Sequence, residues 1–344
     1  MTTSASFSAG LNPSFEWFAA ERPANPQMRD SATLWIMDEA GALAFPRVTL
    51  DAIGGSWDTP WVQLNFVDRA GRTLRLWSQE PGRIGRIDQG RSADRGAGPL
   101  RFKCLEPFRR WSIAFDGQAL QSTTAAQLSG APDGLAVDLA FRFEAEMAAP
   151  PWLMGGMTAQ AAREMKAGDA GALMGGVRYE QLCRVKGWVT VDGETQEISG
   201  TGMRVRRQGV RNMGAAMGHC QHSALFPSGR AFGAIVMAQG PEGTEAFNEA
   251  FLFDQRGRQI SARVVKAPWM THLAEKGDDA SLVLDSAEGT VRIAGEVLAS
   301  LFDHDLFEMA DTSVLHQGTA RYVWDGEEAI GLIERCTLKD GIAS

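Results

Sequence analysis

Apolar and polar residues alternate with a period of two along most of the chain, and short turns that contain Asp and Gly interrupt this alternation. Alternating segments flank the turns at residues 38–41, 68–71, 192–194, 254–257 and 325–328. Strands of about 5 to 8 residues joined by tight turns are typical of antiparallel sheets and barrels. The regular succession of strand and helix that builds a parallel sheet does not occur in the sequence. The pattern therefore predicts an all-β protein.

One segment, residues 158–174, has a helical pattern instead. Thr158 can cap this helix, and Ala161 and Met165 share one of its faces. The segment follows two prolines and lies near the middle of the chain. We therefore expect it to connect two halves.

A hairpin pattern recurs in these halves. Residues 67–76 (VDRAGRTLRL) and 253–262 (FDQRGRQISA) each contain the apolar end of a strand, an acidic turn and a Gly-Arg entry into the next strand. One pair of hairpins does not establish a duplication, because turns of this kind recur for reasons of local geometry.

The composition limits the class of protein. With 344 residues, of which 44% are hydrophobic, the chain can bury two cores. The formal net charge of −8 disfavours nucleic acid and anionic membranes as main partners, because both attract basic proteins. No secretory signal pattern occurs, and no segment approaches the roughly 20 apolar residues of a membrane span. We expect a soluble, cytoplasmic protein without integral membrane association.

The four cysteines are scattered without any CxxC spacing, so they predict neither a disulfide framework nor a zinc site. No nucleophile elbow, phosphate-binding loop or dinucleotide fingerprint is present. The sequence therefore predicts no cofactor and no metal. The chain does contain 10 Trp and 17 Phe against 2 Tyr, a supply of apolar rings that can fill cores or line a pocket for a hydrophobic ligand.

The run GTGMRVRRQGVR at 200–211, followed by FPSGRAFGA at 226–234, resembles the central motif of a tandem-lipocalin family. That family includes carotenoid 1,2-hydratase (hydroxyneurosporene synthase), AttH-like proteins and kievitone hydratase. The C-terminal RYVWDGEEAIGLIER at 321–335 is similar to the last hairpin of bacterial relatives, and the N-terminal SFEWF extends the likeness loosely over the whole chain.

This resemblance implies two lipocalin-like antiparallel β-barrels in tandem, joined by the short helix. The N-terminal barrel domain would span residues 1–175 and the C-terminal one residues 176–344. An interior or a mouth of such a barrel can hold an apolar ligand, and known relatives add water to isoprenoid double bonds or fold a polyene for cyclisation. The sequence leaves open whether the pocket lies within one barrel or between the two.

The motif also departs from the family, whose members commonly read G-x-G-x-R-D-H-S-W-G-x-R. The residues that this chain keeps are Gly200, Gly202, Arg204, Gly209 and Arg211. Where Asp, His, Ser and Trp usually stand, it has Val205, Arg206, Arg207 and Gln208. The usual acid of the family therefore cannot be carried over to this chain.

Two carboxylic acids lie on apolar strand faces and are candidate proton donors. Glu249 shares its face with the candidate wall residues Phe247 and Phe251, and Glu334 shares its face with Ile330 and other apolar residues. Desolvation raises the pKa of a carboxyl group and favours the protonated acid. The alternative for Glu249 is a structural ion pair with an arginine.

Histidines supply further candidates. His316 lies on a face with Tyr322 and Trp324, where it is either a proton carrier beside a ligand or a hydrogen-bonded core residue. In GHCQHSALF, alternation places His219 and Gln221 on one face and His222 on the other, which argues against a metal site formed by both histidines. The row that begins with His219 could line a cavity or face solvent.

The arginines of the central motif divide in the same way. Arg204 and Arg206 point together and Arg207 points oppositely, while Gly209 would mark a turn or bulge before Arg211. We expect structural duty for Arg204 and Arg211. Arg206 or Arg207 could bind an anionic group of a ligand, with Arg206 preferred, although a solvated basic face is the simpler account.

Together these features favour a cofactor-independent enzyme of lyase or isomerase type, such as a hydratase, dehydratase or cyclase. It would act by proton transfer on a hydrophobic small molecule such as a terpenoid, steroid or aromatic metabolite. The catalytic candidates are His219, Glu249, His316 and Glu334. A lipocalin-type carrier without chemistry is the alternative, a structural scaffold ranks last, and a homodimer remains open.

Overall fold

The computed structural model of the chain describes residues 7–131, 133–167, 169–212, 218–239, 244–254, 256–304, 313–338 and 342. Its elements, in chain order, are η1 (Pro13–Glu16), β1 (Phe18–Ala19), β2 (Met28–Asp38), β3 (Leu43–Ile53), η2 (Gly54–Ser56), β4 (Trp61–Asp68), β5 (Arg72–Gln79), β6 (Gly82–Ile84), β7 (Ile87–Asp88), β8 (Arg91–Ser92), β9 (Asp94–Ala97), β10 (Leu100–Glu106), β11 (Arg110–Thr123), α2 (Thr124–Leu128), β12 (Ala136–Met147), β13 (Trp152–Leu153), α3 (Ala159–Ala167), α4 (Asp169–Met174), β14 (Val177–Val191), β15 (Glu194–Val210), β16 (Gly218–Leu225), β17 (Ala231–Gln239), β18 (Thr244–Phe253), β19 (Gln259–Lys266), β20 (Leu282–Ser286), β21 (Gly289–Asp303), β22 (Ser313–Trp324) and β23 (Glu327–Leu338).

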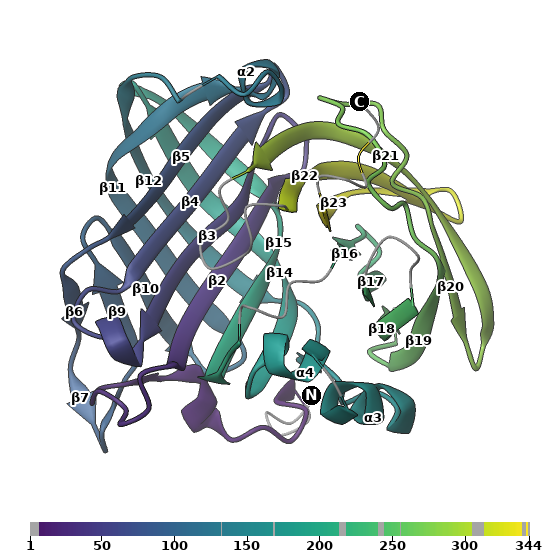
Figure 1. Cartoon of the computed structure of the whole chain (residues 1–344), viewed down its shortest axis with the longest axis horizontal. Coiled ribbons are helices and arrows are strands. Elements are labelled where there is room, and N and C mark those ends of the chain that lie inside the picture. Colours follow the sequence, from purple (N-terminus) through teal and green to yellow (C-terminus); the bar gives the residue numbers. More distant parts are fainter. Residues whose placement is uncertain are drawn as a thin grey trace.

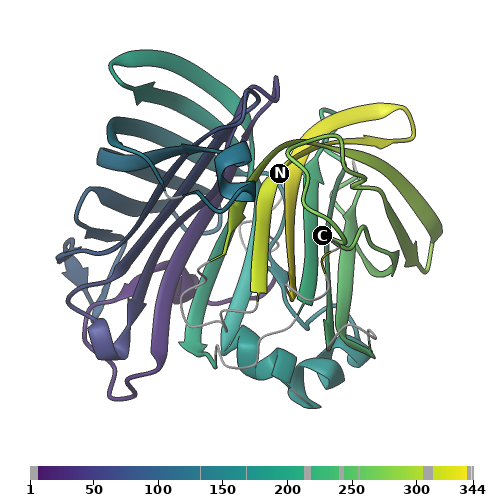
Figure 2. The ribbon, with the colours of Figure 1, turned by 45° about the horizontal axis from the view of Figure 1, so that its top comes forward.

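These strands form two antiparallel barrels side by side, as Figure 1 and Figure 2 show. The strands from β16 to β23 close the second barrel in chain order. In the first sheet, β11 pairs with β5 on one edge and with β12 on the other, which closes a ring of β2, β3, β4, β5, β11, β12, β14 and β15. The all-β prediction and the expectation of two lipocalin-like barrels are confirmed.

Alternation along the strands separates the three largest apolar clusters of the described residues. Phe45, Phe141 and Phe143 pack together inside the first barrel, with ring centroids 4.9 to 5.5 Å apart. A second cluster draws on strands all round the second barrel and forms its interior. The third joins residues from both barrels, such as Trp35 and Leu332, and lies between them. Each barrel thus has a core of its own, and their outer faces meet in a further buried layer.

The hairpins predicted from the Asp-Gly turns form as expected, and the recurring pair occupies equivalent places in the two barrels. The first joins β4 to β5 and the second joins β18 to β19, the third and fourth strands of each run. Asp68 accepts hydrogen bonds from the backbone N–H groups two and four residues later, and Asp254 does the same. The two hairpins therefore share both their position in the run of strands and their turn geometry.

The chain passes from the first sheet to the second barrel later than expected. Strands β14 and β15, which the sequence analysis assigned to the second half, pair with β12 and β2 of the first sheet. Residue 175 therefore does not separate the barrels, since the second barrel begins with β16. The predicted helix forms as α3 and α4. Thr158 caps it, because Thr158 Oγ1 accepts a hydrogen bond of 3.0 Å from the backbone N–H of Ala161. This helical segment connects two strands of the first sheet, β13 and β14, and packs against β18.

Gly209 does not mark a turn or bulge. The β15 pairing with β2 runs without interruption through Gly209 to Val210. A Cβ atom on Gly209 would lie 2.3 Å from the Cα of Gly176, and one on Gly202 would lie 2.4 Å from the carbonyl oxygen of Trp35. These motif glycines permit close backbone approach within the first sheet.

Candidate functional site

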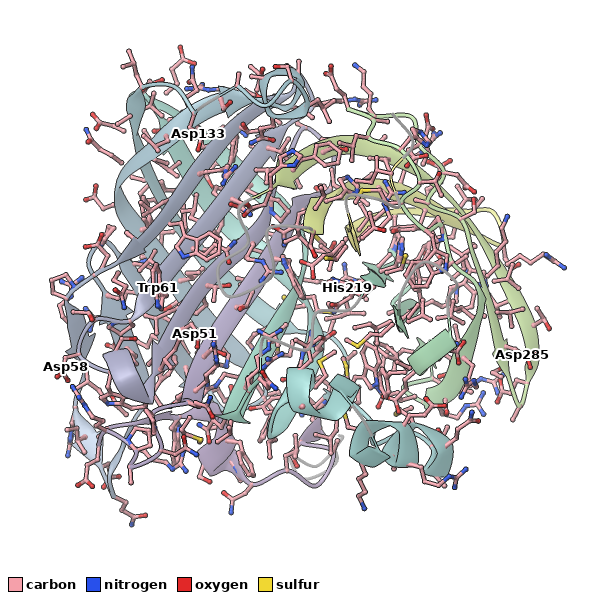
Figure 3. The ribbon with its side chains drawn as sticks, in the orientation of Figure 1. Asp51, Asp58, Trp61, Asp133, His219 and Asp285 are labelled. Carbon is pink, nitrogen blue, oxygen red and sulfur yellow. The ribbon has the colours of Figure 1, made fainter. Side chains whose placement is uncertain are left out.

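A cavity of about 170 Å³ lies between the two barrels. Its walls are the outer faces of first-sheet strands, the outer faces of second-barrel strands, and helix α4. The residues that line it are Arg29, Ser31, Thr33, Trp35, Arg47, Thr49, Asp51, Ile53, Trp61, Gln63, Trp77, Leu173, Met174, Arg178, Val205, Arg207, Arg211, His219, Gln221, Ile235, Met237, Leu315 and Glu334. Figure 3 shows Asp51 and Trp61 on the first sheet and His219 on the part of the second barrel that faces it.

Period-two alternation explains which residues reach this cavity. On β2, Ser31 and Thr33 face it, while Ala32 and Leu34 belong to the core of the first barrel. The first-sheet face is polar because it meets an open space rather than the packed interior. The cavity at the seam is one of the two locations that the sequence left open for a ligand pocket.

His219 and Glu334 meet at this cavity. His219 lies on β16 and Glu334 on the neighbouring β23, and the imidazole Nε2 is 3.2 Å from the carboxylate Oε1. The side chain of His219 is 15% exposed and that of Glu334 is 6% exposed. The structure therefore brings two of the four predicted catalytic candidates into contact, beside a space that a small molecule could occupy.

The carboxylate of Glu334 is held in its charged form. Burial by itself raises the pKa of Glu334, but the charge of Arg47 and the hydrogen bonds from His219 and Gln317 outweigh this effect and hold the pKa well below its ordinary value. Arg47 pairs with Glu334 across the seam. Gln317 in turn accepts a hydrogen bond of 2.6 Å from Asn65 of the first sheet. The acid is thus an anchored anion and not the protonated donor that its apolar face predicted.

An ionised Glu334 decides the tautomer of His219. A carboxylate only accepts hydrogen bonds, so Nε2 of His219 carries the proton that points to Glu334. The other ring nitrogen, Nδ1, has no hydrogen-bond partner among the described residues. In this arrangement a carboxylate orients an imidazole and stabilises its protonated form, as in acid–base dyads.

Gln221 lines the cavity next to this pair, which is one of the two alternatives that its strand face left open. Its side-chain nitrogen donates to both oxygens of Glu180, each at 3.0 Å. Glu180 also pairs with Arg178. Gln221 therefore ties the second barrel to the first sheet, and its carbonyl oxygen remains the part that could face a ligand.

Tryptophans form an apolar part of the wall. The rings of Trp61 and Trp77 meet edge to face, with centroids 6.2 Å apart. The guanidinium of Arg47 lies over the ring of Trp35, 5.8 Å from its centroid. The lining thus combines tryptophan rings with seven charged residues, of which five are arginines. Apolar surface with polar groups at fixed positions is typical of small-molecule sites.

Arg206, the preferred anion-binding candidate, lies outside this cavity. It is fully buried on the opposite face of β15, where Nη1 is 2.8 Å from Asp30 Oδ1 and 2.6 Å from the carbonyl oxygen of Ser31. Its guanidinium also lies 4.6 Å from the centroid of the Phe18 ring. The basic face is not solvated, and Arg206 braces the first barrel. Arg207, its neighbour, lines the cavity instead.

Glu249 is a buried anchor away from the cavity lining. It accepts hydrogen bonds from Trp152 Nε1 at 2.9 Å, Gly155 N at 2.8 Å and Met157 N at 2.9 Å. Burial raises the pKa of Glu249, and these donors oppose that shift. The described residues include no arginine partner for it. Its neighbours Phe247 and Phe251 also lie outside the lining and pack in the cluster between the barrels.

His316, Tyr322 and Trp324 belong to the second barrel and not to the cavity. His316 Nε2 lies 2.9 Å from Ser300 Oγ, and Nδ1 accepts a hydrogen bond from Arg335 Nε at 3.1 Å. Tyr322 and Trp324 pack in the interior cluster. Burial and the charge of Arg335 hold the pKa of His316 well below its ordinary value, so it is a neutral core residue.

Much of the cavity wall was not predicted from the sequence. Arg47, Trp35, Trp61 and Trp77 were not singled out, because a polar strand face opposite an apolar one is ordinarily read as a solvent-facing surface. The useful signal was the placement of tryptophans on that otherwise polar face. The opposite faces predicted for His219 and His222 are confirmed, with His222 buried inside the second barrel.

Among the described residues, no group of three or more His, Cys, Asp or Glu side chains is arranged to hold a metal ion. Within the same part of the chain, no helix is long and apolar enough to cross a membrane.

A family model described as Domain of unknown function (DUF7064) matches residues 18–339. The chain belongs to this family. No curated protein matches the sequence of this DUF7064 member.

Solved structures share the fold of the DUF7064 chain at low identity. The AttH-like protein NE1406 of Nitrosomonas europaea has a TM-score of 0.58 and 16% identity, covering 90% of this chain and 91% of its own. CghA has a TM-score of 0.59 and 13% identity, covering 92% and 90%, and has also been solved with Sch210972. Kievitone hydratase of Nectria haematococca has a TM-score of 0.50 and 11% identity, covering 97% and 95%. These neighbours support the predicted likeness to AttH-like proteins and kievitone hydratase at the level of fold, while the likeness to carotenoid 1,2-hydratase stays a prediction.

Proposed function

We propose that the protein is a cofactor-independent enzyme of lyase or isomerase type that transfers a proton on a hydrophobic small molecule held between the barrels. The observation that carries this proposal is the His219–Glu334 pair at the cavity. Its imidazole has one nitrogen fixed by a buried carboxylate and the other nitrogen without a partner in the described structure. The fold shared with kievitone hydratase adds support for a reaction of the hydratase class.

In the proposed mechanism, Nδ1 of His219 accepts a proton from a carbon of the substrate next to an activating group, and the C–H electron pair enters the substrate. Glu334 stabilises the imidazolium that forms through its hydrogen bond to Nε2. The imidazolium then returns the proton. Return to another carbon completes an isomerisation, whereas transfer to a hydroxyl group that leaves as water completes a dehydration, and hydration is the reverse of the latter.

The walls offer apolar surface to a hydrophobic metabolite, and a cavity of about 170 Å³ favours an aromatic or small terpenoid ligand over a whole steroid. Trp61 and Trp77 offer flat apolar surface on the first sheet, and Ile235 and Met237 offer it on the second barrel. Arg47 keeps Glu334 charged and also lies over Trp35, so it couples the apolar wall to the acid–base pair.

Deuterium labelling tests this function. Hydrophobic compounds that copurify with the protein are identified by native mass spectrometry and then incubated with fresh protein in D2O. We expect a change of structure or the uptake of deuterium at carbon with the wild type, and neither with His219→Gln. His222→Gln, which changes the other histidine of the same strand, is the matched control and keeps the activity.

A carrier gives a different result. If the bound compound is recovered unchanged and free of carbon-bound deuterium after long incubation with the wild type, the enzyme proposal is wrong and the protein is a lipocalin-type carrier.

A further inference from the structure

We propose that one end of the inter-barrel cavity is a binding subsite for an anionic oxygen group, formed by Arg207 and Arg211. On this view the ligand is an amphipathic acid, such as a carboxylic acid or a phosphate ester, and not a neutral hydrocarbon. The assignment rests on the proposed function only for the claim that this ligand is also a substrate.

Arg207 is a buried cation without a partner in the part of the chain that the structure describes. It is 7% exposed and lines the cavity from β15. No described residue forms a hydrogen bond or an ion pair with its guanidinium, and its Nη1 is fully enclosed. A buried charge that is left unpaired destabilises a protein, so such a group calls for a ligand of opposite charge.

The charges of neighbouring arginines further destabilise the buried cation of Arg207. Arg207 lies directly across from Arg178 in the pairing of β14 with β15, and like charges in that position repel. Burial is the main cause that lowers the pKa of Arg207 well below its ordinary value, and repulsion from Arg211 and Arg178 adds to it. Burial and repulsion from Arg29 and Arg178 likewise lower the pKa of Arg211 to about 9. Burial and repulsion among the arginines therefore both disfavour the charged forms of Arg207 and Arg211.

Three carboxylates lie in or behind the cavity wall, and they do not balance this charge. Among the described residues, each of them already forms an ion pair with an arginine that lines the cavity. These pairs are Arg29 with Asp51, Arg47 with Glu334, and Arg178 with Glu180. Arg207 and Arg211 remain. Within the described residues, the side chain of Arg211 donates a hydrogen bond only to the carbonyl oxygen of Leu173, at 2.6 Å. Two guanidinium groups are thus available to one anion, whose oxygen atoms they can bind in pairs.

The strand register places this subsite away from the acid–base pair. Arg207 pairs with Ser31 of β2, and Ser31 pairs with Asp51 of β3. Arg47, which holds Glu334, lies four residues before Asp51 on the same strand. At about 3.3 Å per residue, the backbone levels of the two sites differ by about 13 Å. An elongated ligand would place its anionic end at Arg207 and its reacting carbon near His219.

Anion-dependent thermal stability tests the subsite without any turnover. The unfolding temperature of the intact protein is measured in sodium acetate, sodium phosphate and sodium chloride at equal ionic strength. At roughly ten times the dissociation constant, an anion that binds only the folded state raises the unfolding temperature of a chain of this size by about 2 °C. We expect acetate or phosphate to do so relative to chloride, and Arg207→Met and Arg211→Gln to abolish the difference.

The arms of the experiment identify the ligand class. A response to acetate assigns the subsite to a carboxylic acid, and a response to phosphate alone assigns it to a phosphate ester. Phosphate also stabilises proteins in general, so only the part of its effect that Arg207→Met removes is counted. Arg142→Met, which removes an exposed arginine of β12, is the matched control and keeps the full response.

Equal unfolding temperatures in all three salts, or equal responses in the wild type and Arg207→Met, would overturn the subsite. Loss of deuterium exchange in His219→Gln concerns the proposed reaction and leaves this result untouched. An anion response in a protein that converts no ligand would support an acid-binding carrier, so the two proposals fail separately.

Discussion

Arg206 and Arg207 are consecutive residues of β15, yet their guanidinium groups lie on opposite faces of the strand. Arg206 is fully buried and bonded to Asp30, with Nη1 2.8 Å from Oδ1. Arg207 faces the inter-barrel cavity and has no partner in the described structure. The pair therefore offers two identical substitutions with opposite expected results.

Arg206→Met should destabilise the protein by about 3–5 kcal/mol, because it leaves the carboxylate of Asp30 buried without its cation. Arg207→Met should instead raise the free energy of unfolding by about 1 kcal/mol, since it removes a buried charge that has no partner. Urea denaturation of both variants measures the difference. A loss of stability in Arg207→Met as large as that in Arg206→Met would show that Arg207 has a structural partner.

Glu334→Gln should reduce kcat by roughly a hundredfold or more while changing KM little. The amide cannot stabilise the imidazolium that forms when His219 accepts a proton, whereas the ligand does not depend on this group for binding. Steady-state kinetics on the identified substrate measure both constants. Retained kcat together with a raised KM would assign Glu334 to binding.

The stability of the protein should fall as the pH drops below about 6.5, in part because of His222. Burial, assisted by the charge of Arg335, lowers the pKa of His222 to about 3, against about 6.5 in the unfolded chain. Between these values the unfolded state binds a proton that the folded state does not, so stability rises with pH in this window and falls as the pH decreases. The contribution is about 1.4 kcal/mol per pH unit.

His222→Gln removes the group that binds this proton in the unfolded state. The variant should therefore show a smaller change in the free energy of unfolding per pH unit. The side chain lies in the second barrel, where Nδ1 is 2.8 Å from the hydroxyl oxygen of Tyr322 and where Arg335 contributes positive charge. Urea denaturation at pH 6.5 and at pH 5 gives the slope. An unchanged slope in the variant would contradict the neutral, buried state of His222.

Glu249→Gln should destabilise the protein by about 1–3 kcal/mol. The amide nitrogen would face one of three N–H donors that now point at the carboxylate, from Trp152, Gly155 and Met157. Hydrogen exchange should quicken at the backbone amides of Gly155 and Met157. If turnover falls while the exchange rates and the stability stay unchanged, Glu249 acts on the substrate and is not an anchor.

The pattern of the sequence was sufficient for the all-β class and for the direction of individual side chains, whereas the two barrels were expected from the family resemblance. The Asp-Gly turns marked hairpins, and alternation separated His219 from His222 and Arg206 from Arg207 correctly. Alternation gives only two faces, however, and does not say which face is the interior. Arg206 was preferred over Arg207 for this reason, and His316 was placed beside a ligand although it faces the core of the second barrel.

The composition of the site depended on contacts that no local pattern contains. Arg47 and Glu334 are 287 positions apart in the chain and meet only because β3 and β23 lie across the seam. The apolar face of Glu334 predicted a protonated acid. The guanidinium of Arg47, which keeps Glu334 ionised, lies on another strand and could not be found from the pattern of the strand that contains Glu334. The domain boundary was placed too early for a similar reason, since the pairing of β15 with β2 joins distant segments.

The cavity at the seam has a consequence for how this chain can change over time. On β2 and β3, the residues that would meet a ligand, such as Ser31, Thr33 and Thr49, alternate with the residues that build the core of the first barrel. Substitutions at the cavity-facing positions change the chemistry of the cavity wall and leave the phenylalanine core intact. The architecture therefore separates the positions that can diversify from those that must be conserved for folding, which makes this protein a suitable scaffold for the evolution of new specificities.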